Sequence, residues 1–87
     1  MAVSAQRVTA STSAVALNTA TTSGHRLLLK NTSANAADLG PSTVTAGTGF
    51  DLAAGATVQV ELAPGDILYA IRSAAADAVI AVLRLQG

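Results

Sequence analysis

The stretch TVQVEL, residues 57–62, decides the fold class, because apolar and polar side chains alternate in it without interruption. Successive side chains of a β-strand point to opposite faces of the sheet. Val58, Val60 and Leu62 would therefore share one face, and the three polar residues between them would share the other. This alternation predicts a half-buried strand.

Runs on both sides of this stretch also predict strands. The sequence RLLLK, residues 26–30, places Leu27 and Leu29 on an inner face. Residues 67–72 and 79–85 are more continuously apolar, which is typical of central strands that are covered on both faces. In the last run, one face would carry Val79, Ala81, Leu83 and Leu85, and the other Ile80, Val82 and Arg84. Weaker strands are expected at residues 3–9, 14–17, 37–39 and 43–45 and around Phe50.

Turn residues separate the predicted strands. Glycine adopts positive φ without steric cost, and the pair Pro64-Gly65 suits the two central positions of a type II turn. Short strands that alternate with turns in this way predict an all-β fold in a single domain, residues 1–87. We expect a small antiparallel β-sandwich or a jelly-roll-like barrel of about 7–9 short strands.

Two segments leave alternatives open. Residues 73–84 are rich in Ala and Leu, which favour a helix, but β-branched residues and the lack of a 3.6-residue stripe favour a last strand. Residues 4–23 are rich in Thr and Ser, and we expect one edge strand with a mobile tip there. Within this part of the chain, residues 1–12 are a candidate for an extended N-terminal arm.

The composition indicates a chain that associates with other chains. Hydrophobic residues make up 51% of the 87 residues, charged residues make up 11%, and the net charge is zero. A chain of this size has a small core and here no cysteine to crosslink it, so we expect other chains to cover part of its apolar surface. The zero net charge disfavours nucleic-acid binding, and no apolar run is long enough to span a membrane. The N-terminus has no apolar region typical of a secretory signal, so we expect synthesis in a cytoplasm.

Residues suited to catalysis or metal binding are few. The only imidazole is that of His25, which we expect at the entrance of a strand, as an exposed turn residue. Asn31-Thr32-Ser33 matches a glycosylation acceptor that we interpret as a chance match. Asp51 and Asp66 are interpreted as turn residues whose carboxylates bind nearby backbone amides. We therefore expect no enzymatic activity, no cofactor and no metal site. The five carboxylates, none beside another in sequence, are Asp38, Asp51, Glu61, Asp66 and Asp77.

A series of turn motifs follows the strand at residues 26–30 in a specific order. LLLKNTSAN at residues 27–35 leads to DLG at 38–40, TVT at 43–45, GF at 49–50, LAAG at 52–55 and PGDILYA at 64–70. Over residues 26–72, this order resembles that of small β-sandwich virion proteins of tailed bacteriophages. Among these proteins, a capsid decoration (cement) protein is the most similar in size.

The resemblance implies a virion structural protein on the exterior of the capsid. Decoration proteins bind the outer surface of the shell, typically as trimers, and bridge neighbouring major capsid subunits against the pressure of the packaged DNA. The partners implied are the major capsid protein and further copies of the chain in a homotrimer. Two alternatives stay open: a small tail or head appendage involved in host attachment, and another oligomeric β-module.

The N-terminal segment is the partner-binding site expected under this hypothesis. An extended segment can add a strand to the sheet edge of a capsid subunit or of a neighbouring copy. The residues expected to make this contact are Ala2, Val3, Ser4, Ala5, Gln6, Arg7, Val8 and Thr9.

Overall fold

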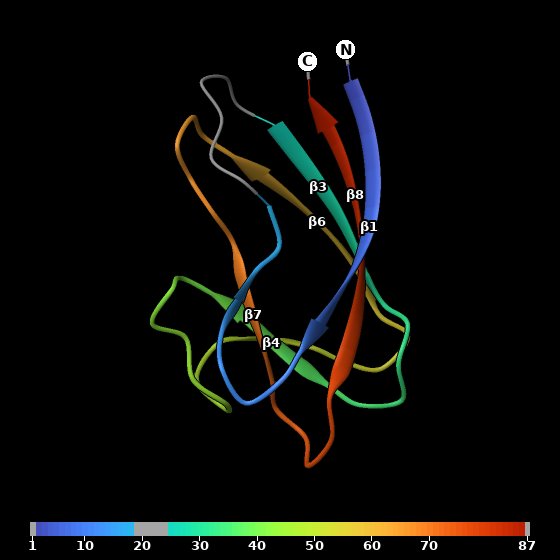
Figure 1. Ribbon diagram of the computed structural model, residues 1–87, viewed down its shortest axis with the longest axis vertical. Coiled ribbons are helices and arrows are strands. Elements are labelled where there is room, and N and C mark those ends of the chain that lie inside the picture. Colours follow the sequence, from blue (N-terminus) through green and yellow to red (C-terminus); the bar gives the residue numbers. More distant parts are fainter. Residues whose placement is uncertain (1, 19–24, 87) are drawn as a thin grey trace.

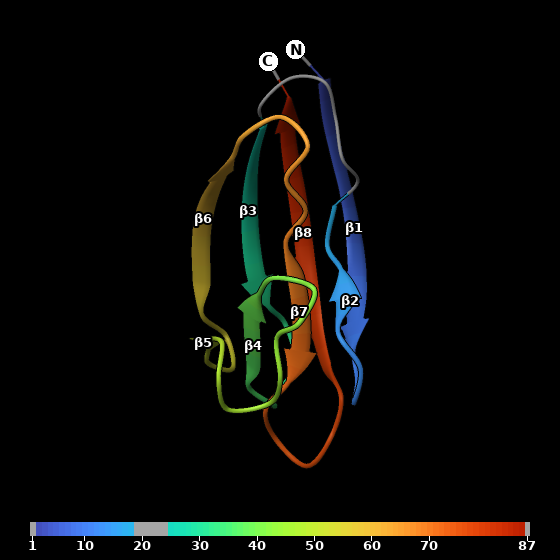
Figure 2. The same ribbon diagram turned by 90° about the vertical axis from the view of Figure 1, so that its left-hand side faces the viewer.

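The computed structural model describes residues 2–18 and 25–86, which form a sandwich of two four-stranded antiparallel sheets (Figure 1). The larger sheet has the order β1 (Ala2–Ala10), β8 (Ala78–Gln86), β3 (His25–Asn31) and β6 (Thr57–Leu62). The smaller sheet has the order β2 (Val15–Ala16), β7 (Tyr69–Arg72), β4 (Ala37–Gly40) and β5 (Phe50–Leu52). Figure 2 shows the larger sheet face on, with β6, β3, β8 and β1 side by side from left to right and the smaller sheet in front of it. The predicted all-β sandwich is confirmed.

The alternation of apolar and polar residues that predicted β6 corresponds to an alternation of half-buried and exposed side chains in the structure. The three polar residues of β6 are exposed, while Val58, Val60 and Leu62 are half-buried and pack against the core. In the neighbouring β3, Leu27 and Leu29 are fully buried and Leu28 lies on the opposite face. Each of these side chains lies on the face that the sequence predicted.

The core lies between the two sheets and consists of small and medium-sized aliphatic side chains. Leucine supplies most of the volume, and alanine allows the sheets to approach closely where it faces inward. The fully buried larger side chains are those of Leu17, Leu27, Leu29, Leu52, Ile80 and Asn31. Ala10, Ala37, Ala70 and Ala78 complete the inner layer without any exposed surface.

The last strand settles the alternative for residues 73–84. Residues 78–86 form β8, which pairs with β1 on one side and with β3 on the other, so the helical alternative is wrong. The backbone of a central strand forms hydrogen bonds with a neighbouring strand on each side, and this pairing outweighs the helix propensity of its alanines. Ala78, Ile80 and Val82 are buried in the core, and the alternate residues Val79, Ala81, Leu83 and Leu85 lie on the other face, half-buried.

The N-terminal segment is part of the sheet. β1 pairs with β8 without interruption from Ala2 to Ala10, Val8 packs against the core and Ala10 is buried within it. Residues 2–10 are therefore an edge strand of the larger sheet, as expected, and not the extended arm for which residues 1–12 were a candidate. Residues 19–24, at the end of the segment for which a mobile tip was expected, lie outside the described residues.

The turn at Pro64-Gly65 is confirmed, whereas one predicted strand is wrong. The amide of Asp66 donates to the carbonyl of Ala63 at 3.1 Å, and Gly65 has a φ of 85°, as a type II turn requires. Residues 43–45 form no strand and belong to the loop between β4 and β5. A turn closes at the start of this loop, because the amide of Val44 donates to the carbonyl of Pro41 at 2.9 Å.

No described residue is helical, and the described part of the chain therefore contains no helix able to cross a membrane. The buried polar side chains, Asn18, Asn31 and Asp38, are all hydrogen-bonded. No described side chain leaves a buried nitrogen or oxygen without a partner. These three residues attach loops to the sandwich, because each bonds to backbone groups far from it in sequence.

Candidate interaction surface

The described residues gather no catalytic or metal-binding cluster. No three His, Cys, Asp or Glu side chains lie close enough together in this part of the chain to hold a metal ion. His25 begins β3, where its backbone pairs with Leu62 and Gln86, and its side chain lies outside the described part. His25 therefore lies at the entrance of a strand, as predicted, and its backbone belongs to the strand and not to a turn.

Two carboxylates far apart in sequence face each other across strands β4 and β5. Asp38 lies opposite Asp51, but their surroundings differ, since Asp38 is only 2% exposed and Asp51 is exposed. Oδ2 of Asp38 accepts hydrogen bonds from the amides of Gly47 at 2.6 Å and Gly49 at 3.3 Å. Asp38 therefore holds a loop in place. The carboxylate of Asp66 accepts from the amide of Ala63 at 3.3 Å, which confirms its predicted role in a turn.

The glycosylation match at residues 31–33 contains a buried asparagine. Asn31 has no exposed surface, and its side-chain nitrogen donates to the carbonyls of Asn35 at 2.7 Å and Leu52 at 3.1 Å. A glycan on this nitrogen would replace both hydrogen bonds and have no room inside the sandwich. The asparagine is therefore a structural residue of the core.

The feature best suited to binding is the face of the larger sheet that points away from the smaller sheet, named here the outer face. Strand pairing places the same alternate residues of neighbouring strands together on it. Strands β1 and β8 contribute Val3, Ala5, Arg7, Thr9, Val79, Ala81, Leu83 and Leu85. Strands β3 and β6 contribute Arg26, Leu28, Lys30, Thr57, Gln59 and Glu61.

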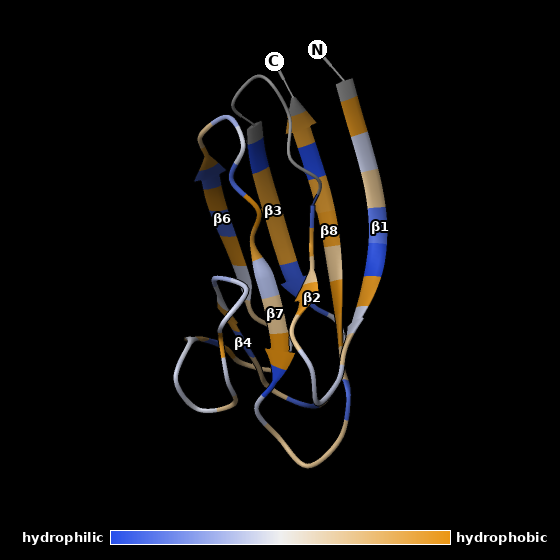
Figure 3. Cartoon of the chain, turned by 60° about the vertical axis from the view of Figure 1, so that its left-hand side comes forward, coloured by the Kyte–Doolittle hydropathy of each residue, from blue (hydrophilic) through white to orange (hydrophobic). Residues whose placement is uncertain are grey.

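The middle of the outer face is apolar and open to solvent. Ala5, Leu83 and Leu28 are direct neighbours in one cross-strand row, and Leu28 is 37% exposed. Val3, next to Leu85 at the β1 edge, is 61% exposed. Figure 3 shows that apolar residues dominate the central strands β3 and β8. A shallow depression of about 610 Å³ lies over this area, with Ala5, Leu28, Ala81 and Leu83 in its lining.

The charges on the outer face are mostly positive. Arg7 and Lys30 flank Ala81 in the row next to Leu28 and Leu83, and both are exposed. Arg26 has an acidic neighbour, since its Nε lies 3.6 Å from Oε1 of Glu61. Three of the five Lys and Arg residues of the chain therefore lie on this face, around an apolar centre.

Only half of the predicted contact residues reach the outer face. Val3, Ala5, Arg7 and Thr9 lie on it, while Ser4, Gln6 and Val8 point to the opposite side of β1. The backbone of Ala2 pairs with that of Gln86 at the end of β1. The N-terminal segment thus contributes alternate residues to a surface shared by four strands.

The sequence interpretation missed the contributions of β3 and β8. Leu28 and Leu83 form the centre of the outer face, and neither was among the expected contact residues. The alternation of the last strand did group Leu83 with Ala81 and Leu85. That alternation could not tell the inner face from the outer one, because both faces of the strand are apolar.

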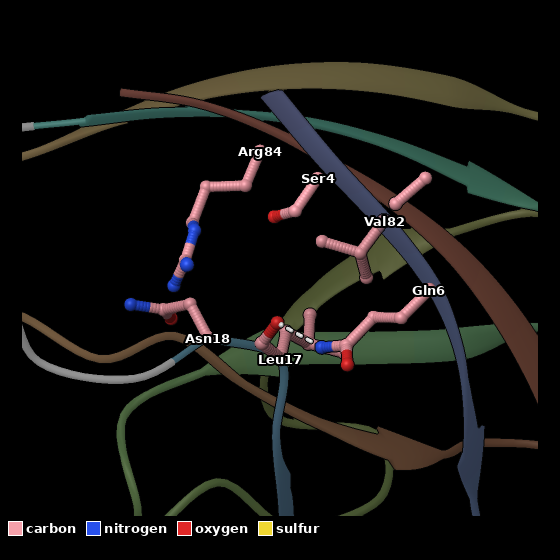
Figure 4. A pocket seen from close by; sticks show the side chains of 7 residues that line it. Ser4, Gln6, Leu17, Asn18, Val82 and Arg84 are labelled. Carbon is pink, nitrogen blue, oxygen red and sulfur yellow. Dashed lines mark hydrogen bonds between the residues drawn. The ribbon is translucent and has the colours of Figure 1, made fainter. Parts of the chain in front are cut away.

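A second, more polar space lies between the sheets near the ends of β1 and β8. It measures about 190 Å³, and Figure 4 shows Arg84 of β8 and Asn18 of the segment after β2 projecting into it. The side-chain nitrogen of Gln6 donates to the carbonyl of Leu17 at 3.2 Å across this space. Gln6 therefore connects the edge strand to the other sheet.

Comparison of this chain with protein-family models, with curated proteins and with solved structures gave no match. The order of turn motifs in residues 26–72 and the surface geometry are therefore the observations from which a function can be argued.

Proposed function

We propose that the protein is a non-enzymatic structural protein of a tailed-phage virion, which binds the outer surface of the capsid as a homotrimer and stabilises the shell. The observation that carries the proposal is the apolar, solvent-open centre of the outer face, formed by Ala5, Leu28 and Leu83. Exposed apolar patches on small proteins mark surfaces that other chains cover.

The electrostatics of the chain support a protein partner. The net charge is zero, so long-range attraction to nucleic acid is weak even though three cations lie on the outer face. The face also has no aromatic side chain on which bases or sugar rings could stack. A surface of small apolar side chains with a few cations at its margin fits a protein surface that is apolar with acidic groups around it.

A cement function follows from many weak contacts acting together. The contact area that one copy of an 87-residue chain can offer is modest. Copies that are joined to one another bind a repetitive shell with an effective concentration that raises the overall affinity without any new contact. Each bound oligomer then bridges capsid subunits and opposes their separation.

Edge strand β1 supports the proposed strand addition to a capsid subunit or a neighbouring copy. No other described strand pairs with the side of β1 that faces away from β8. Removing the whole segment is a poor test, because Val8 and Ala10 belong to the core. Point substitutions on exposed residues are cleaner, because they leave the sandwich intact.

The experiment is a sedimentation assay with empty shells of the phage that encodes the chain, prepared without this protein. The purified wild-type protein is expected to pellet with the shells and to saturate at a fixed number of copies per shell. Leu28→Lys is expected to weaken this binding by about tenfold or more, because it places a charge in the apolar centre. Thr43→Lys is the control, since Thr43 is an exposed polar residue in the loop between β4 and β5, away from the outer face.

The proposal fails if the wild-type protein does not bind the shells at any concentration tested. It also fails if the protein binds envelopes of the host bacterium instead, which would support the host-attachment alternative. Equal binding by Leu28→Lys and the wild-type protein would remove the outer face from the mechanism.

A further inference from the structure

The two edges of the larger sheet are formed by strands that run in opposite directions. The order β1-β8-β3-β6 is antiparallel at every step, so β1 and β6 are antiparallel to each other at opposite edges. Each pairs with one described strand on its inner side. Alternate backbone N–H and C=O groups of both strands therefore point away from the sheet, toward the position of a further strand.

Most of the features that commonly prevent strands of different molecules from pairing are missing from both edges. Such features are proline, charged side chains (above all lysine), a β-bulge or a very short edge strand, and each edge carries one charged residue, which is not lysine. β1 has nine residues in unbroken register, β6 has six, and neither contains proline or lysine. Both edges are thus open to the addition of a strand.

We propose that copies of this chain join head to tail, with β6 of one copy pairing antiparallel with β1 of the next, and that three copies close into a ring. The inference rests on the self-association included in the proposed function and specifies how the copies meet. A neighbouring copy placed in the same orientation presents β1 to β6 in the antiparallel sense without being turned over. The outer faces of the three larger sheets then join edge to edge, with the polar residues of each β6 between the apolar centres of neighbouring copies.

Ring closure explains why both edges are unprotected. A contact between two different surfaces of the same chain produces either a closed ring or an open filament. In a closed ring, every β1 has a β6 partner and no free edge is left to recruit further chains. A two-fold contact between two β1 strands would satisfy one edge and leave both β6 edges open.

The charges on the two edges favour the head-to-tail contact. Arg7 is the charged residue of β1, Glu61 is the charged residue of β6, and both lie on the outer face. The Glu61 side chain is 77% exposed, and its contact with Arg26 is long, at 3.6 Å. β6 of one copy therefore brings an acidic group to the basic edge of the next. A β1–β1 contact offers Arg7 no acidic partner, and a β6–β6 contact brings two carboxylates together.

Proline substitutions can block one edge at a time. Consecutive residues of an antiparallel strand point their N–H groups to opposite sides, so one of Ser4→Pro and Ala5→Pro removes only an outward N–H group. The same holds for Val58→Pro and Gln59→Pro on β6. In each pair, circular dichroism and a thermal melt identify the variant that stays folded. Ala5→Thr and Gln59→Thr are the matched controls, because they keep the N–H group.

Light scattering then gives the mass of each folded variant and of their mixture. The wild-type protein and both threonine controls are expected at three times 8.6 kDa, and each proline variant alone at 8.6 kDa. An equimolar mixture of the two proline variants is expected at twice 8.6 kDa, because one copy still offers β6 and the other still offers β1. Only a head-to-tail contact gives this recovery in the mixture.

The inference is overturned if the wild-type protein is a monomer, or if the β6 variant keeps the mass of the wild-type assembly. It is also overturned if the mixture of proline variants stays at 8.6 kDa. These outcomes are separate from those of the shell assay. A monomer that pellets with shells contradicts the ring and leaves capsid binding intact, whereas a ring that ignores shells contradicts capsid binding alone.

Discussion

Asp38 and Gly49 are in direct contact, since Oδ2 of the buried aspartate accepts a hydrogen bond from the glycine amide at 3.3 Å. The same oxygen accepts a shorter hydrogen bond, of 2.6 Å, from Gly47. The two glycines flank Thr48 in the loop between β4 and β5. One carboxylate therefore fixes the path of a loop that contains no regular structure of its own.

Asp38→Ala is expected to lower the free energy of unfolding by about 2 kcal/mol, because two backbone N–H groups lose their acceptor. Urea denaturation at a single protein concentration measures the change, since self-association would make stability depend on concentration. Asp51→Ala, on the opposite strand but exposed, is the control and is expected to cost less than about 0.5 kcal/mol. Equal losses in the two variants would contradict the assigned role of Asp38.

Gly49→Ala is expected to destabilise the same loop by steric overlap. A Cβ atom on Gly49 would lie 2.6 Å from the carbonyl oxygen of Leu39 and 2.7 Å from Cγ2 of Val44. Overpacking of this kind costs about 1–3 kcal/mol, which a thermal or urea unfolding curve would show. Gly47 offers a contrast, because its φ is 85° but nothing lies within 4 Å of an added Cβ atom.

Gly47→Asn is accordingly the matched control for Gly49→Ala. Asparagine tolerates the left-handed conformation better than most residues, so this variant is expected to lose less than about 1 kcal/mol. If Gly49→Ala unfolds at the same urea concentration as the wild-type protein, the close approach of Gly49 to Leu39 is not important for stability.

Strands with a clear alternation of apolar and polar residues could be predicted from the sequence. The pairing of strands that are distant in sequence could not be predicted. The inward positions of Val58 and Leu27 followed from the two-residue period of their strands. The pairing of β1 with β8 joins residues that are 68 to 84 positions apart, from Ala10 with Ala78 to Ala2 with Gln86, and no local pattern specifies that partner. This is why the N-terminal segment was interpreted as a possible arm.

Only the part of the outer face that β1 contributes was predicted, because the other strands of this face are distant from β1 in sequence. Val3, Ala5, Arg7 and Thr9 were among the expected contact residues, but their neighbours on other strands were not. The alternation in β3 predicted that Leu28 points outward, but its neighbours Leu83 and Ala5 come from strands distant in sequence, so the apolar patch around Leu28 could not be predicted. The predicted strand at residues 43–45 was wrong because Val44 packs beneath its own loop, against Gly40 and Gly49.

Asn31→Ala is expected to be among the most damaging polar substitutions. Its Nδ2 donates to the carbonyls of Asn35 and Leu52, and its Oδ1 accepts from the amide and hydroxyl of Ser33 at 3.0 and 2.7 Å. Removing this fully buried amide leaves several groups without partners, at a cost of about 3 kcal/mol. The urea midpoint at fixed protein concentration measures the loss.

Thr32→Ala is the control for Asn31→Ala, because the threonine hydroxyl makes one exposed hydrogen bond, of 3.2 Å, to the carbonyl of Val79. This neighbouring substitution is expected to cost about 0.5–1 kcal/mol. A loss for Asn31→Ala as small as that for Thr32→Ala would show that water can replace the buried network.

Two ion pairs of different exposure should respond differently to substitution and to salt. Arg72 and Asp77 are 2.9 Å apart at the turn between β7 and β8, with side chains 28% and 49% exposed. Arg26 and Glu61 are farther apart and more exposed, so solvent screens their attraction more strongly. Asp77→Asn is expected to lower the free energy of unfolding by about 0.5–1 kcal/mol and Arg26→Gln by less than about 0.5 kcal/mol, measured by urea denaturation at low ionic strength.

Repeating both measurements in 1 M NaCl should reduce the difference between the two variants, since the Debye length there is about 3 Å. A larger loss for Arg26→Gln would mean that its pair with Glu61 is better shielded from water than its exposure indicates, as it would be if another copy of the chain covered this edge.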